Sequence, residues 1–128
     1  MIRQVFHVKN YWEVVVFWDI DYDLFSVVKG ELRRCNASSY NIAKVYRDLK
    51  YGEAKAATYS NIHKHVSIVL FNRHETRGDY INSIVHEAEH VKQDMLYAYY
   101  VDDSGEPPAY TIGYLVMRMY GVFRCLLA

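Results

Sequence analysis

The chain has 128 residues, enough for one domain, and its 52% apolar and 23% charged residues exclude wholesale disorder. Fifteen Lys and Arg residues balance fifteen Asp and Glu residues, so the chain lacks the basic footprint of nucleic-acid binders and we expect no nucleic-acid partner. Two cysteines, Cys35 and Cys125, are too few for a disulfide scaffold and indicate free thiols in a reducing cytosol, so we expect a cytoplasmic protein. We predict a single domain over residues 1–128.

The first half of the sequence predicts a β-hairpin followed by two helices. Over residues 2–8 a period of two places Ile2, Gln4, Phe6 and Val8 on one face and Arg3, Val5 and His7 on the other. Residues 11–18 contain the run V-V-V-F, which is typical of a central strand buried on both faces. Residues 24–35 and 40–49 have helical spacing and are separated by N-A-S-S, which supplies stop and cap residues.

The second half predicts a loop at residues 52–57, a short strand at 58–60 and a longer strand at 65–71. The period then changes to that of a helix from Asp79 to about Tyr100, and a last helix follows from near Pro108 to the C-terminus. This order of strands and helices predicts an α+β domain with a short mixed sheet.

Residues 83–91 contain the sequence H-E-x-x-H within a strongly periodic helix. His86 and His90 are four residues apart, so they lie one turn above each other and can bind one cation. Glu87 lies beside that face, where its carboxylate could take a proton from a metal-bound water. The helix can also pack into a core through a separate apolar stripe, which comprises Ile81, Ile84, Ala88, Val91, Met95 and Ala98. The alternative is an ordinary helix with surface histidines and an exposed glutamate.

Glu106 is the candidate third ligand, because a catalytic zinc takes three protein ligands and keeps one open position. The helix carries the chain roughly 15 Å from His90 to about Tyr100, and the extended residues 101–106 span up to about 20 Å, so the return is feasible. The alternative role of Glu106 is a carboxylate stabilised by the dipole of the last helix. Tyr110, one turn later, could donate a hydrogen bond to an oxyanion.

Three segments carry a resemblance to a known family. They are V-S-I-V-L-F-N from residue 66, V-H-E-A-E-H from residue 85, and E-P-P-A-Y from residue 106 with Gly113 and Tyr114. Over roughly its last fifty to sixty residues the chain resembles small zincin-like proteins of the gluzincin type, including hypothetical proteins of phages and mobile elements. Its E-x-x-A pattern is also similar to that of repressor-cleaving metalloproteases of mobile elements, although the residues that follow differ.

The resemblance implies a Zn²⁺ site in which His86, His90 and Glu106 are ligands and Glu87 is the general base. It also implies a small zincin-like domain with an N-terminal β-hairpin, a short mixed sheet, an active-site helix and a C-terminal glutamate helix. Many gluzincins have an acidic residue four positions after the third ligand that supports a histidine, and here Tyr110 stands there. The remaining candidates for that support are Asp94, Asp102 and Asp103.

These observations predict a zinc-dependent metallopeptidase that hydrolyses peptide or protein substrates with a metal-activated water. The first alternative is a non-catalytic, metal-bearing interaction module of a phage or mobile element, which the small size of the chain favours. The second is a purely structural domain without a metal.

The last twenty residues are mostly apolar, but Arg118 and Arg124 would each cost roughly 2.5–3.5 kcal/mol at a bilayer centre, so we predict a buried helix and no membrane span. We expect the N-terminal sheet and helices to cover this helix, or the helix to form a homodimer contact. The predicted apolar face comprises Ile112, Leu115, Val116, Met119, Val122 and Leu126, with Phe123 on another side.

Overall fold

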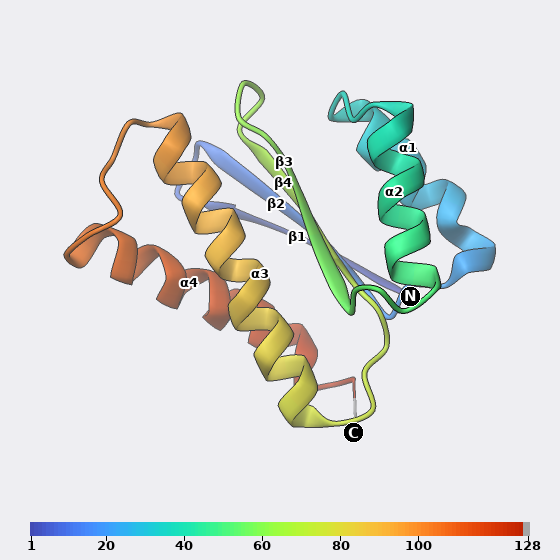
Figure 1. The fold of residues 1–128 in the computed structure, drawn as a ribbon. Coiled ribbons are helices and arrows are strands. Elements are labelled where there is room, and N and C mark those ends of the chain that lie inside the picture. The colour runs from blue at the N-terminus through green and yellow to red at the C-terminus, as the bar shows by residue number, and fades with distance from the viewer. Residues whose placement is uncertain (127–128) are drawn as a thin grey trace.

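The computed structural model describes residues 1–126, over which the chain forms four α-helices, one short 3-10 helix and a four-stranded mixed sheet (Figure 1). The α+β class and the predicted order of elements are confirmed. The elements are β1 (Ile2–Val8), β2 (Trp12–Trp18), the 3-10 helix η1 (Tyr22–Leu24), α1 (Phe25–Arg34), α2 (Ser39–Lys50), β3 (Ala56–Asn61), β4 (Val66–Phe71), α3 (Arg77–Ala98) and α4 (Glu106–Phe123).

The strand order in the sheet is β1-β2-β4-β3. β1 pairs antiparallel with β2 as the predicted hairpin, β2 runs parallel to β4, and β3 returns antiparallel to β4. β2 is therefore an inner strand, and residues 14–17 are completely buried, as the apolar run predicts. β1 and β3 form the two opposite edges of the sheet.

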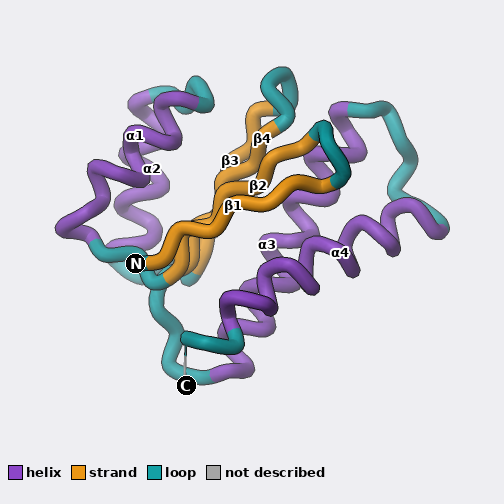
Figure 2. The backbone as a smooth tube through the Cα atoms, turned by 180° about the vertical axis from the view of Figure 1, so that it is seen from behind, coloured by secondary structure: helices purple, strands orange, loops and turns teal. Residues whose placement is uncertain are grey.

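Two pairs of helices cover the two faces of this sheet (Figures 1 and 2). Since successive side chains of a strand point to opposite faces, Val15 and Phe17 of β2 pack toward α1 and α2, whereas Val14 and Val16 pack toward α3 and α4. The chain thus has one hydrophobic cluster on each side of a shared sheet.

Several boundaries differ from the sequence prediction. β3 begins at Ala56, within the predicted loop, because its pairing with β4 extends over the whole of residues 56–61. His65 lies in the turn before β4, with φ of 56°, and its ring stacks on that of Trp12. α3 begins at Arg77, because the Thr76 hydroxyl caps it by accepting a hydrogen bond from the Asp79 amide at 3.1 Å.

α4 packs against α3 and β1. The N-terminal sheet therefore covers this helix through β1 as predicted, but the covering helix is α3, because the N-terminal helices α1 and α2 lie on the other face of the sheet (Figure 1). Leu115 and Met119 are buried as predicted, but Phe123 is also buried, at 1% exposure. The assignment of Phe123 to another side was wrong, because its ring lies over Tyr80 of α3. No helix within residues 1–126 has the length and apolarity needed to cross a bilayer.

Candidate metal centre

α3 presents the H-E-x-x-H residues on the flank that faces the β3 edge of the sheet. Its inner face buries Ile84, Ala88, Val91 and Met95 in the core, whereas Ile81 of the predicted stripe is 48% exposed. On the side of the helix next to this inner face, Glu87 packs against β3, and the two histidines lie further round the helix and are exposed to solvent.

His86 and His90 are brought together as the spacing predicts. Their Nε2 atoms lie 3.2 Å apart, and their rings meet edge to face with centroids 4.8 Å apart. Two Zn–N bonds of about 2.0–2.1 Å at a tetrahedral angle separate the nitrogens by roughly 3.3 Å. The separation of the two nitrogens therefore matches that of two ligands of one tetrahedral zinc ion.

Glu87 is buried beside this pair, with 4% of its surface exposed. Its Oε1 accepts a hydrogen bond of 3.0 Å from Thr58 Oγ1 on β3, and its Oε2 lies 3.8 Å from His86 Nε2. Burial raises the pKa of the Glu87 carboxyl, while the bond from Thr58 and the nearby histidines lower it in part. A carboxylate with a raised pKa, one oxygen fixed and the other near the ligand pair, is suited to accepting a proton.

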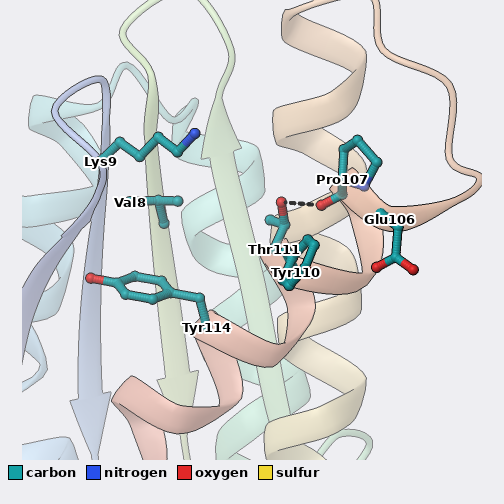
Figure 3. Close-up of a pocket in the computed structure, with 7 residues that line it drawn as sticks. All are labelled: Val8, Lys9, Glu106, Pro107, Tyr110, Thr111 and Tyr114. Carbon is teal, nitrogen blue, oxygen red and sulfur yellow. Dashed lines mark hydrogen bonds between the residues drawn. The ribbon is translucent and has the colours of Figure 1, made fainter.

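The structure does not bring Glu106 into this group. Glu106 is the first residue of α4 and lines a pocket of about 770 Å³ beside Lys9, with its carboxylate turned away from that lysine (Figure 3). The physical reason lies in the packing, because α4 rests on the β1 edge of the sheet whereas α3 rests on the β3 edge. Among residues 1–126, no three His, Cys, Asp or Glu side chains are arranged to hold a metal ion.

Tyr110 shares the pocket of Glu106, one helical turn further along α4, and is 73% exposed (Figure 3). Asp103, a predicted support for a histidine, instead accepts a hydrogen bond of 2.8 Å from Lys92 Nζ, which also pairs with Glu89 at 2.8 Å. These two carboxylates raise the pKa of Lys92 and tie the segment before α4 to α3.

Sequence reasoning missed two contacts that fix the position of the H-E-x-x-H helix. The first is the bond from Thr58 to Glu87. The second is the buried ring of His74, whose Nδ1 donates to the Asn72 carbonyl at 2.6 Å and whose Nε2 lies 2.7 Å from Ser83 Oγ. Ser83 precedes Glu87 by one turn, so this bond anchors α3 to the end of β4. The two contacts join residues 29 and nine positions apart, which lie in different elements, so neither follows from the periodicity of one helix or strand.

Comparison with protein-family models, curated proteins and solved structures gives no match to this chain. Support for a metal site therefore comes from the donor atoms alone. Two imidazole nitrogens at a chelating separation beside a buried carboxylate fit part of a catalytic zinc site, with one protein ligand still to be supplied.

Proposed function

We propose that this chain is a zinc-dependent metallopeptidase of the zincin type. His86 and His90 hold the ion and Glu87 is the base, while Glu106 would complete the site as third ligand only if the start of α4 moves toward α3 when zinc binds. The observation that carries the proposal is the 3.2 Å separation of the histidine Nε2 atoms beside the buried carboxylate of Glu87. When bound, zinc supplies a water whose pKa is lowered toward neutrality and a Lewis acid that polarises the substrate carbonyl.

The remaining steps, which are proton transfer to and from Glu87, are carried out by residues of the chain. Thr58 holds Oε1 of Glu87, so Oε2 is the oxygen that accepts the proton on the side of His86. Burial keeps bulk water from competing for this carboxylate, and its raised pKa makes it a better proton acceptor than an exposed glutamate. Protonated Glu87 then donates that proton to the leaving amine.

β3 supports a peptide as the substrate class. It is an edge strand of the sheet, so one row of its backbone groups faces away from β4 and can pair with an extended chain. Thr58 belongs to this strand and contacts Glu87, so a peptide paired along β3 would pass close to the base.

The decisive experiment measures zinc content and hydrolysis in protein purified without a histidine tag or added metal. We expect about one zinc per chain and cleavage of unfolded casein that a chelator abolishes. Glu87→Gln should keep the zinc and lose hydrolysis, and His90→Ala should lose both. His63→Ala replaces an exposed histidine in the β3–β4 turn and should change neither.

The role of Glu106 has its own test. Glu106→Gln should weaken zinc binding, measured by competition with a chromogenic chelator, while Glu75→Gln, at an exposed position before α3, should not. A Glu106→Gln variant that binds zinc as tightly as the parent protein would exclude Glu106 as a ligand.

The second candidate function is a non-catalytic, metal-bearing interaction module. It is favoured by one observation, namely that only two of the predicted ligands are brought together among the described residues. Zinc retained without any casein hydrolysis would support this alternative. A chain that binds no zinc at all would overturn both.

A further inference from the structure

The charge of this neutral chain is unevenly distributed. Residues 25–50, which comprise α1, α2 and their connection, contain six basic and two acidic residues and so carry a net charge of +4. The other residues contain nine basic and thirteen acidic residues, a net charge of −4. The α1–α2 layer is therefore the positive side of the molecule, on the face of the sheet opposite α3 and α4 (Figures 1 and 2).

Half of these basic residues already have partners within the layer. Arg34 pairs with Glu31, Lys44 pairs with Asp48 at 2.7 Å, and Lys50 donates to the Tyr46 hydroxyl at 2.8 Å. The other three basic residues form no ion pair within residues 1–126. They are Lys29, Arg33 and Arg47.

These three residues line one groove between α1 and α2, with a volume of about 430 Å³. Lys29 and Arg33 follow Phe25 at intervals of four along α1, and Ala43 and Arg47 follow Ser39 at intervals of four along α2, so each helix contributes one row. Each row spans roughly 12 Å. Ala43 is a small residue within the α2 row, which leaves room for a side chain of a ligand.

The groove combines one aromatic pair with cations along its length. Phe25 and Tyr46 lie together at one end, with ring centroids 4.8 Å apart at 70°, and Arg47 directly follows Tyr46 there. Lys29 follows one turn along α1, and Arg33, at the end of α1 near the start of α2, lies at the other end. A ligand that fits must combine an apolar side chain with several negative charges.

We infer that this groove binds an acidic peptide segment that carries one large apolar side chain. The guanidinium groups of Arg33 and Arg47 match carboxylates, which they can bind through two hydrogen bonds, and Lys29 supplies a third cation. The length of the groove matches about four residues of extended peptide. A nucleic acid is the poorer fit, because the rest of the chain is acidic and offers no continuous basic track.

Fluorescence anisotropy tests this inference, with the metal-free protein as well as the zinc-loaded one. The probe is a fluorescein-labelled peptide with the core Asp-Glu-Leu-Glu-Asp, and its matched control has the core Asn-Gln-Leu-Gln-Asn. We expect binding of the acidic probe alone, weakening as salt rises. The double variant Arg33→Glu, Arg47→Glu should weaken binding at least about tenfold.

Two further variants distinguish binding in the groove from nonspecific attraction to the charge of the protein. Ala43→Trp fills the groove without changing its charge and should also abolish binding, whereas Arg73→Glu, the reversal of a single charge outside the groove, should leave it within about twofold. The inference is overturned if the acidic probe does not bind or if the groove variants bind like the parent protein. It is equally overturned if single-stranded oligothymidine binds as tightly as the peptide. Zinc chelation should not change the result, so this test is independent of the proposed peptidase.

Discussion

Replacing Thr58 by valine tests how the fold holds the carboxylate of Glu87. Valine keeps the branched shape of threonine and removes the hydroxyl that donates to Glu87 Oε1 at 3.0 Å. Glu87 is 4% exposed, so water cannot readily replace the lost donor. A hydrogen bond to a charged group contributes about 1.5–3 kcal/mol, and we expect Thr58→Val to lower the free energy of unfolding by about 2 kcal/mol at neutral pH.

Urea unfolding followed by tryptophan fluorescence measures this loss. With a slope of about 2 kcal/mol/M, the midpoint should fall by about 1 M. Thr58→Ser keeps the hydroxyl and removes one methyl group, so it should cost no more than about 0.8 kcal/mol. In a Glu87→Gln background the acceptor is neutral, and the cost of Thr58→Val should shrink to about 1 kcal/mol.

Two results would refute this reasoning. One is a midpoint of Thr58→Val within about 0.2 M of the parent protein, which would mean that the bond does not stabilise the fold. The other is an equal loss in the Glu87 and Gln backgrounds, because the effect would then be independent of the charge.

Three other predictions follow from burial and charge. Burial raises the pKa of Glu87 above its ordinary value of 4.5, so the folded state holds this proton more tightly and the parent protein loses stability as the pH rises through that raised pKa. The glutamine of Glu87→Gln does not titrate, so the free energy of unfolding of this variant, measured in urea, should rise relative to that of the parent protein between about pH 4 and pH 7. A difference between the two free energies that stays constant over this range would contradict the prediction. Leu115→Ala should cost about 2–5 kcal/mol in thermal unfolding, because Leu115 is completely buried, whereas Met117→Ala, at 58% exposure, should cost less than about 0.5 kcal/mol. Arg118 is exposed and lies over the ring of Tyr114 at 5.9 Å, so Arg118→Glu should cost about 1 kcal/mol, and circular dichroism showing an unfolded chain would disprove this placement.

The sequence predicts those features that depend on neighbouring residues. Alternation in residues 2–8 and the buried run in residues 11–18 predict the hairpin, because side chains on a strand alternate between its faces. The spacing of His86 and His90 likewise predicts their meeting, because residues four apart on a helix are neighbours.

The position of Glu106 depends on packing that no local pattern records. The chain between His90 and Glu106 is long enough to return to the histidines, but its length does not determine the direction in which α4 starts. That direction is set by Leu115 and Met119, which bury α4 against the core and bring its first residue to the end of β1. β3 illustrates the same limit, because residues 56–61 are all partly buried and show no alternation from which a partner for Glu87 could be inferred.

The parallel pairing of β2 with β4 has a consequence for the order of folding during synthesis. Val16 of β2 lies opposite Val69 of β4, so more than fifty further residues must be synthesised before β2 can pair with its second neighbouring strand. Until then the run V-V-V-F-W has only β1 beside it, and such apolar β-formers associate readily between chains. The α1–α2 pair emerges in that interval and packs on Val15 and Phe17 of β2, so it can cover one face of the unfinished sheet before β4 is synthesised.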